Sequence, residues 1–401
     1  GGFLTIQIKH LASLQAARYT CCMTYQTINT QQQLTAFCQQ LEHQAWFVID
    51  TEFLRKDTYY PELSLIQVCS EQGELALIDP LVIDDMQVFW RLLANPKVTK
   101  VFHSARQDIE VLFQVGGLMP QAIFDTQIAC VFLGHGDLAG LARVIEAEFG
   151  HTLDKAQTRT NWHQRPLSEQ QIQYALDDVR YLAPLYKKLL ESLTQTQLQA
   201  LQWDFNQLLN PELYHIPPDQ AWCRIKGTQA LSPKQIGIVH RLAAWREQTA
   251  IDANLPRKWV LPDEALITLA KRPVRAVEGL YKIKELNAGL VRQYGEAIIQ
   301  QLDLAFSQPE NWPQKPAKPA PATAEEEPII QAAIAYAQQQ AVEYGLNLAN
   351  LLQKRDVLEL LRSQSGPLTQ GWRAEVVGKK LSAFFNHQAC LNVENGHLHL
   401  T

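Results

Sequence analysis

The stretch Trp46-Phe47-Val48-Ile49-Asp50-Thr51-Glu52 is the most informative part of the chain for its fold, because an apolar run ends in two carboxylates. Such a run is typical of a buried β-strand. Side chains at positions i and i+2 of a strand point to the same face, so Asp50 and Glu52 should project together. Two carboxylates this close repel each other unless a cation lies between them. The stretch predicts a metal site at a strand end, although a solvated Asp-x-Glu pair would have the same pattern.

The sequence around this strand is typical of the α/β class. Further strands are predicted at 63–69, 74–79 and 98–103, and helices at 105–115, 125–133, 137–148 and from Ser168 to about 193. Adjacent strands followed by alternating strands and helices imply a mixed sheet flanked by helices. From about residue 230 onward we expect helices and no strand.

Three more side chains are placed to join the first two carboxylates. Asp108 falls in the first turn of a helix, where the helix dipole alone also favours a carboxylate. Tyr174 and Asp178 lie four residues apart on a helix and therefore share one face. Carboxylates from these places could hold two ions, Mg²⁺ or Mn²⁺, that clamp the attacking and leaving oxygens of a phosphodiester. Tyr174 would hold the attacking water.

Composition sets limits on the class of protein. The 401 residues suit two or three domains, and 46% hydrophobic with 19% charged residues is typical of a soluble globular protein. No apolar stretch is long enough for a transmembrane helix. The seven scattered cysteines lack zinc-ligand spacing and predict reduced thiols in a cytoplasmic protein. No Gly-rich phosphate loop indicates a nucleotide kinase.

Charge is distributed unevenly along the chain. The whole chain carries a net charge of −5, but residues 222–305 hold 13 Lys/Arg against 8 Asp/Glu. A basic module joined to an acidic one suits a phosphate backbone and metal ions respectively. Ordinary scatter of charge could give the same difference.

The predicted domains follow these composition changes. We interpret residues 1–22 as an extension that precedes a natural start at Met23, with a transit peptide as the alternative. We expect an α/β domain over 23–205, a helical domain over 206–305 and a Pro/Ala-rich linker over 306–328. A second small helical domain is expected over 329–401.

Several sequence blocks resemble the ribonuclease D family. The blocks are Asp50-Thr51-Glu52-Phe53-Leu54-Arg55, Thr58 to Gln67, Asp125-Thr126-Gln127-Ile128-Ala129, Leu153-Asp154-Lys155 and Tyr174 to Leu182. The resemblance implies a ribonuclease-H-like fold of the DEDD exonuclease superfamily. Gln173 stands where a sister subclass has histidine, which indicates the tyrosine subclass. Residues 225–305 are similar to the HRDC-type helical domain, through motifs such as Leu231-Ser232-Pro233-Lys234-Gln235 and Asn254-Leu255-Pro256-Arg257, and 329–388 fit the position of a second, divergent copy.

The resemblance implies hydrolysis of RNA from its 3′ end, with release of nucleoside 5′-monophosphates and a role in tRNA 3′ maturation. By it, Asp50, Glu52 and Asp178 hold the tighter ion, and Asp50 with Asp108 serves the second. Tyr174 orients and helps to deprotonate the water. The partners would be tRNA precursors and other structured RNAs, and the protein would be a monomer.

Other side chains are weaker candidates for binding substrate. His103 is placed to contact the scissile phosphate, or else to be structural. Phe53 and Tyr59 could stack on terminal bases, with core packing as the alternative for Phe53. Basic residues of the helical region could bind phosphates or form a solvated face: Arg246, Arg257, Lys258, Lys271 and Arg272. Trp245 and Trp259 are predicted to be core residues.

Two other functions fit parts of the pattern. A DNA proofreading-type exonuclease would use the same carboxylates, because they do not contact the sugar. A non-catalytic RNA-binding module is the other possibility, although such a protein should have lost at least one of the five site residues.

Overall fold

A computed structural model describes residues 24–154, 156–309, 312–313 and 320–401. The predicted extension at 1–22 lies outside these residues. The chain divides into two compact units. The first contains the residues up to Glu52, Leu63–Asn206 and Ala335–Thr401, and the second contains Phe53–Glu62 and Gln207–Ile334.

The first unit is built on a six-stranded mixed sheet with strand order β1-β4-β3-β2-β5-β6. Its strands are β1 (Tyr25–Ile28), β2 (Trp46–Leu54), β3 (Glu62–Ser70), β4 (Leu75–Ile78), β5 (Thr99–Phe102) and β6 (Ile123–Asp125). β3 runs antiparallel to β4, whereas β1–β4, β2–β5 and β5–β6 are parallel pairs. The mixed sheet predicted from the sequence is therefore confirmed.

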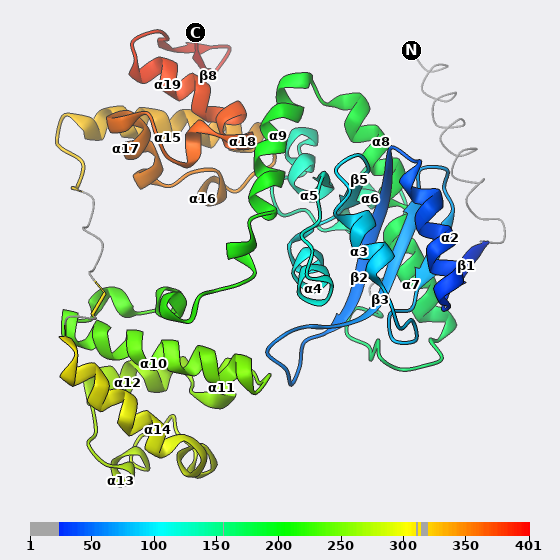
Figure 1. Ribbon diagram of the computed structural model, residues 1–401. Helices are drawn as coiled ribbons and strands as arrows, with labels where there is room; N and C mark the ends of the chain where they lie inside the picture. The colour runs from blue at the N-terminus through cyan, green and yellow to red at the C-terminus, as the bar shows by residue number, and fades with distance from the viewer. Residues whose placement is uncertain (1–23, 155, 310–311, 314–319) are drawn as a thin grey trace, which may run out of the picture. The chain divides into compact units, whose positions relative to one another are not determined.

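Helices flank this sheet (Figure 1). They are α2 (Gln31–Glu42), α3 (Gln87–Leu93), α4 (Arg106–Gly116), α5 (Thr126–Ala129), the 3₁₀ turn η1 (Cys130–Leu133), α6 (Leu141–Phe149), α7 (Glu169–Arg180), α8 (Leu182–Ser192) and α9 (Gln195–Leu208). The single helix predicted from Ser168 to 193 is two helices that meet at Tyr181. Pro184 explains the break, because it has no N–H for the carbonyl of Arg180 and its ring crowds that turn.

The last part of the chain, from Ala335, belongs to the same compact unit as the sheet. It contains the end of α15 (Glu326–Glu343), then α16 (Leu348–Leu351), α17 (Lys354–Ser363), η6 (Pro367–Thr369), α18 (Gly371–Arg373), the π-helical turn η7 (Ala374–Gly378) and α19 (Lys379–Phe385). The Asp204 carboxylate on α9 accepts the backbone N–H of Trp372 at 2.8 Å. This contact helps to fix the segment on the unit that holds the sheet.

A β-hairpin follows these helices, so the prediction of no strand after residue 230 was wrong. β7 (Leu391–Glu394) pairs antiparallel with β8 (His397–Leu400). The turn is Asn395-Gly396, with φ of 52° and 81°. Asn-Gly is a strong signal for a two-residue hairpin turn, because both residues tolerate positive φ. The sequence therefore contains a local signal for this hairpin, which the prediction overlooked.

The second unit is helical apart from the segment Phe53–Glu62. Its elements are η2 (Pro211–Leu213), η3 (Pro218–Arg224), η4 (Thr228–Ala230), α10 (Pro233–Asp252), α11 (Arg257–Val260), α12 (Asp263–Lys271), α13 (Val277–Leu280) and α14 (Ala288–Ser307). Ser232 caps α10 through a capping box with Gln235, and Pro233 occupies the first turn. A core that includes Leu242, Leu266 and Ile298 joins these helices.

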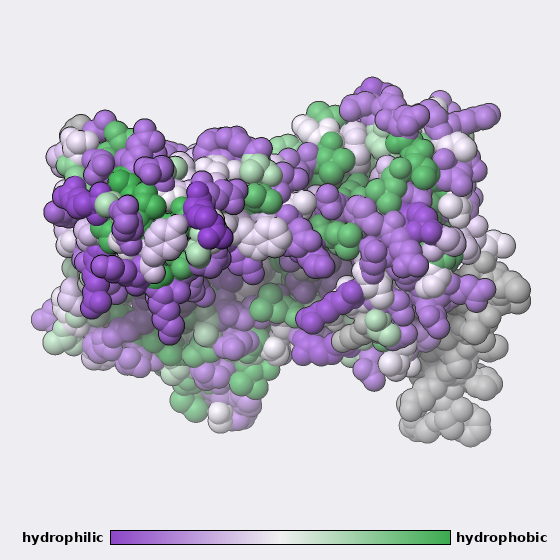
Figure 2. Space-filling view, turned by 90° about the horizontal axis from the view of Figure 1, so that it is seen from below, coloured by the Kyte–Doolittle hydropathy of each residue, from purple (hydrophilic) through white to green (hydrophobic). Residues whose placement is uncertain are grey.

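Hydrophilic residues cover most of the face shown in Figure 2, with smaller hydrophobic patches between them. Within the described residues, no helix is both long and apolar enough to cross a bilayer.

Candidate active site

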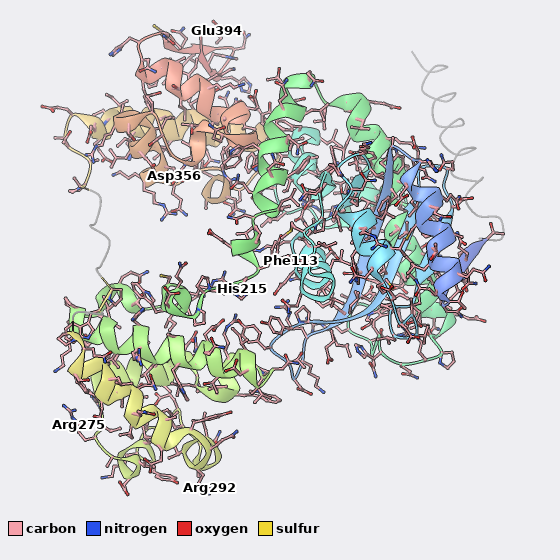
Figure 3. The ribbon with its side chains drawn as sticks, in the orientation of Figure 1. Phe113, His215, Arg275, Arg292, Asp356 and Glu394 are labelled. Carbon is pink, nitrogen blue, oxygen red and sulfur yellow. The ribbon has the colours of Figure 1, made fainter. Side chains whose placement is uncertain are left out.

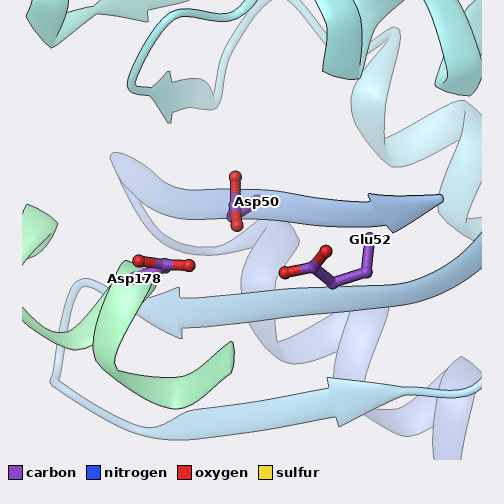
Figure 4. A group of neighbouring side chains, drawn as sticks. All are labelled: Asp50, Glu52 and Asp178. Atoms are coloured by element: carbon purple, nitrogen blue, oxygen red, sulfur yellow. The ribbon is translucent and has the colours of Figure 1, made fainter. Parts of the chain in front are cut away.

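Three carboxylates from two elements gather in the first unit (Figure 4). Asp50 and Glu52 lie on β2, and Asp178 lies near the end of α7. One oxygen of each can be chosen so that all three lie within 4.8 Å of one another. The fold thus brings Asp178 close to Asp50 and Glu52, which lie more than 120 positions earlier in the sequence. The i, i+2 spacing places the first two on one face of the strand, and the last turns of α7 carry the third.

Burial and mutual repulsion disfavour three negative charges in this place. Burial is the largest cause raising the pKa of Asp50 to about 7. Burial, then repulsion by Asp50, Asp178 and Asp108, raises the pKa of Glu52 to about 10. Burial and repulsion by Asp50 raise the pKa of Asp178 to about 8, against a hydrogen bond from Tyr174 that lowers it. A cation among these oxygens would remove the repulsion, so the donor set fits a hard divalent ion.

Asp108 has a different environment from the other three carboxylates. It is buried in the first turn of α4, and its Oδ1 accepts the Thr51 hydroxyl at 2.5 Å. Burial, followed by repulsion from Asp50, raises its pKa well above the ordinary range. Asp108 therefore interacts electrostatically with Asp50, but it does not belong to the group formed by Asp50, Glu52 and Asp178.

Tyr174 lies one turn before Asp178 on α7, as the spacing predicted. Its hydroxyl is 3.4 Å from the Thr158 hydroxyl, and its ring lies 5.9 Å from the Trp162 ring. Burial and the nearby carboxylate of Asp178 raise the pKa of the phenol further above its ordinary value. Tyr174 therefore keeps its proton at neutral pH and can donate a hydrogen bond.

Two residues that position the site were not singled out from the sequence. The Asp125 carboxylate accepts the backbone N–H groups of Ser104 at 3.0 Å and Ala105 at 2.8 Å. Ser104 has a φ of 65°, so these bonds hold a left-handed residue at the turn that leads to Asp108. Thr51 was quoted only as the residue between two carboxylates, yet its hydroxyl orients Asp108. No spacing rule in the sequence identifies either role.

His103 makes structural contacts. Its Nδ1 is 2.9 Å from the Thr126 hydroxyl, and its Nε2 is 2.9 Å from the carbonyl of Ala139. Burial lowers the pKa of the imidazole, which favours the neutral form. With both nitrogens engaged by the protein, the geometry gives no support to a contact with phosphate.

The remaining candidates lie in the second unit, where Phe53 is half-buried and Lys258 is exposed. Tyr59 and Arg257 both contact Glu247, and the Arg257 guanidinium lies 4.6 Å from the centre of the Tyr59 ring. One face of that ring is therefore already covered. Lys271 and Arg272 are exposed.

Two interpretations of this unit need correction. Arg246 is only 4% exposed and donates to the carbonyl of Leu261 at 3.0 Å and to Asp263 at 2.5 Å, so it is not part of a solvated face. Trp259 is 48% exposed and is not a core residue, and Val260 is the buried residue of the short α11. Trp245 is half-buried against Tyr294, with ring centres 5.9 Å apart.

Comparisons with known proteins identify the family of this chain. A family model described as a 3′-5′ exonuclease matches residues 25–194, and a model of the HRDC domain matches residues 235–302. Ribonuclease D of Pseudomonas paraeruginosa is 34% identical over 364 residues, which cover 89% of this chain and 96% of the relative. Ribonuclease D of Bartonella henselae is 32% identical over 372 residues, 89% of each chain.

A solved structure is similar over nearly the same length. The crystal structure of Escherichia coli RNase D, described as an exoribonuclease involved in structured RNA processing, has 29% sequence identity and a TM-score of 0.77. The match covers 91% of this chain and 99% of that one. These findings confirm the resemblance and the exonuclease fold inferred from the sequence blocks.

Proposed function

We propose that this chain, which belongs to the ribonuclease D family of hydrolytic 3′→5′ exoribonucleases, uses Asp50, Glu52, Asp108, Tyr174 and Asp178 to release nucleoside 5′-monophosphates from RNA. The observation that carries the assignment of residues is the group formed by Asp50, Glu52 and Asp178. One oxygen of each residue can be chosen so that the three lie within 4.8 Å of one another, and the described residues place no cationic side chain in an ion pair with them.

The residues present fit a pair of Mg²⁺ or Mn²⁺ ions. Asp50, Glu52 and Asp178 would hold the first ion, and Asp50 with Asp108 the second. Such ions lower the pKa of a bound water and neutralise charge on the phosphate and the leaving oxygen. The central strand fixes Asp50 and Glu52, while the hydroxyl of Thr51 fixes Asp108.

Tyr174 positions the attacking water in this proposal. Its raised pKa argues against outright proton abstraction, because the phenol remains protonated at neutral pH. The hydroxyl therefore orients the water through a hydrogen bond. Thr158, at 3.4 Å, limits the directions in which the hydroxyl can turn.

We also propose that the substrates are tRNA precursors and other structured RNAs with free 3′ ends. The likeness to Escherichia coli RNase D, an exoribonuclease involved in structured RNA processing, supports this substrate class. A cytoplasmic, monomeric enzyme is proposed as well. The described cysteines support the location, because Cys38, Cys69, Cys130, Cys223 and Cys390 are all free thiols.

Digestion of one RNA labelled at its 5′ end or at its 3′ end tests the reaction directly. With Mg²⁺ or Mn²⁺, the 5′ label should appear in a ladder of shortening products, and the 3′ label should leave first as a 5′-monophosphate. Chelator should stop both. The opposite order of release, or unchanged hydrolysis in chelator, would contradict the proposal. A DNA oligomer of matched sequence tests the alternative of a DNA exonuclease, which predicts equal or faster turnover of DNA.

A further inference from the structure

The helical unit contains a cavity of about 570 Å³ that none of the residues proposed for hydrolysis lines. Its walls come from the segment Phe53–Glu62, from residues 216–225 and from helices α10 to α12, all of which belong to the same compact unit. A cavity of this size is in the range of ligand sites in proteins.

Positive charge predominates in the lining. Six cationic residues and three carboxylates line the cavity: Arg55, Lys56, Arg224, Arg246, Arg257 and Lys258, with Glu247, Asp263 and Glu264. Two ion pairs within the lining join Arg246 to Asp263 at 2.5 Å and Arg257 to Glu247 at 2.7 Å. The remaining lining residues therefore carry an excess of positive charge, which favours an anionic ligand.

A buried hydrogen-bond network fixes the shape of the cavity. Glu247 is 1% exposed, and its two oxygens accept Arg257 Nε at 2.9 and 2.7 Å. Its Oε1 also accepts the Tyr59 hydroxyl, to which Arg257 Nη2 donates at 2.9 Å. The side-chain oxygen of Asn254 accepts the backbone N–H of Tyr59 at 3.1 Å. The segment that carries Arg55 and Lys56 is thus held on the ends of α10 and α11 by charge-assisted bonds.

Three cations of the lining have their charge available. Lys56, Arg224 and Lys258 are exposed, and their side chains make no ion pair or hydrogen bond within the described part of the chain. The buried Nε of Arg246 also lacks a hydrogen-bond partner in the described part of the chain. Guanidinium and ammonium groups around a preformed cavity are suited to phosphate oxygens.

We infer that this cavity binds backbone phosphates of the RNA strand, upstream of the 3′ nucleotide that is removed. The inference rests on the proposed function. Arg55 and Lys56 follow Glu52 by only three and four residues. Even a fully extended chain of this length spans at most about 14 Å, so these two cations remain close to the carboxylate strand. An RNA whose 3′ end lies at the carboxylates therefore carries phosphates within reach of the cavity.

The test removes the three available charges together, as Lys56→Gln, Arg224→Gln and Lys258→Gln in one full-length chain. The matched control is Lys282→Gln, Lys284→Gln and Arg292→Gln, three exposed cations of the same unit that do not line the cavity (Arg292 is labelled in Figure 3). Both variants lose three positive charges, so a difference between them reports position and not net charge. Thermal melting of both checks that they are folded.

The readout is kcat/KM in Mn²⁺ for RNA oligomers of increasing length, from a dinucleotide upward. For the cavity variant, the loss relative to wild type should grow with length and reach about tenfold or more on long oligomers, where the salt dependence of binding should flatten by a log–log slope of about 2. The control variant should track wild type at every length. An equal loss in both variants, or a loss that does not change with length, would overturn the inference.

A free nucleotide carries the same chemistry as a backbone phosphate, so fluorescently labelled AMP is the second arm. Weak AMP binding that does not differ between wild type and the cavity variant agrees with a strand site. If the cavity variant loses AMP affinity while long RNA is hydrolysed normally, the cavity is a nucleotide site and the inference fails. If wild-type protein hydrolyses no RNA of any length, the proposed function itself has failed, which is a different result.

Discussion

Two regions of this molecule contain buried carboxylates, and the surroundings of these carboxylates are opposite in kind. In the helical unit, Glu247 is satisfied by Arg257 and by the Tyr59 hydroxyl. In the unit with the sheet, Asp50, Glu52 and Asp178 lie together, burial raises the pKa of each, and repulsion by neighbouring carboxylates raises the pKa of Glu52 and Asp178 further. A buried charge is stable when it is paired. The surroundings of Glu247 fit a structural role, whereas those of the group of three fit the proposal that a cation from outside the chain binds there.

The largest expected effect comes from removing one charge of the group of three. Asp50→Asn or Asp178→Asn should lower turnover by at least about 10³-fold, because an amide keeps the shape and loses the charge that binds the ions. In chelator, neither variant should melt below wild type, since the substitution removes repulsion. The measurement is RNA hydrolysis in Mg²⁺ together with thermal melting.

Glu191→Gln is the matched control, because it removes an exposed carboxylate of the same unit. Its activity should equal that of wild type. Retention of more than about a tenth of wild-type activity by Asp50→Asn would show that the ligand assignment is wrong.

The next effect concerns the hydroxyl beside the carboxylates. Tyr174→Phe should slow single-turnover cleavage of a short RNA in saturating Mn²⁺ by about 10²-fold or more, with little change in the dissociation constant. The phenyl ring remains against Trp162, so packing is kept. Tyr174→Ala loses the ring as well. Wild-type cleavage by the Phe variant, with only the Ala variant slow, would make Tyr174 a packing residue.

Substitution of Glu247, the carboxylate with a full set of hydrogen bonds, should affect the stability of the protein more than its catalysis. Glu247→Gln leaves the Arg257 guanidinium and the Tyr59 hydroxyl without their charged acceptor and should destabilise the helical unit by about 2 kcal/mol. Urea unfolding followed by tryptophan fluorescence measures this, with Asp303→Asn, an exposed carboxylate of the same unit, as control. Equal unfolding midpoints for both variants would remove the contrast between the two regions.

The smallest effect is the pH dependence of stabilisation by metal. Without metal, folded Asp50 and Asp178 have pKa values of about 7 and 8, against about 4 in an unfolded chain. Between pH 4 and 8 the folded state therefore holds more protons than the unfolded state, so stability falls as pH rises across this window. Bound Mn²⁺ replaces these protons.

The rise in melting temperature on adding Mn²⁺ should consequently be larger at pH 8 than at pH 5.5. Scans of the wild-type protein with and without Mn²⁺ at the two pH values measure it, and Asp50→Asn serves as the control with little rise at either. A larger rise at the lower pH would contradict the sign of the argument.

Much of the sheet and its carboxylates could be predicted because they depend on local periodicity. The apolar run that leads to Asp50 and the helix that carries Tyr174 and Asp178 are both continuous patterns in the sequence, although β2 continues to Leu54. Short elements could not be predicted where tertiary contacts decide the structure. β6 has three residues, and its Asp125 both ends the strand and caps the next helix, so only the helix over 125–133 was predicted and the strand before it was missed.

The helical unit was harder to predict for a different reason. The pairing of Tyr59 with Glu247 joins residues 188 positions apart, and no pattern within either segment indicates it. Charge alone suggested that Arg246 binds phosphate or lies on a solvated face, whereas the structure buries it beside Asp263. Local sequence gives the character of a side chain, and the partner that determines its role comes from the fold.

A titration with Mn²⁺ followed by electron paramagnetic resonance, which measures free ions, asks directly whether the buried carboxylates hold metal. Wild-type protein and Glu191→Gln should each bind two ions per chain, and Asp50→Asn should lose both, because Asp50 is shared by the two proposed sites. Asp108→Asn should lose only the second. Equal binding of Mn²⁺ by wild type and Asp50→Asn would contradict the claim that these carboxylates face one another in order to hold metal.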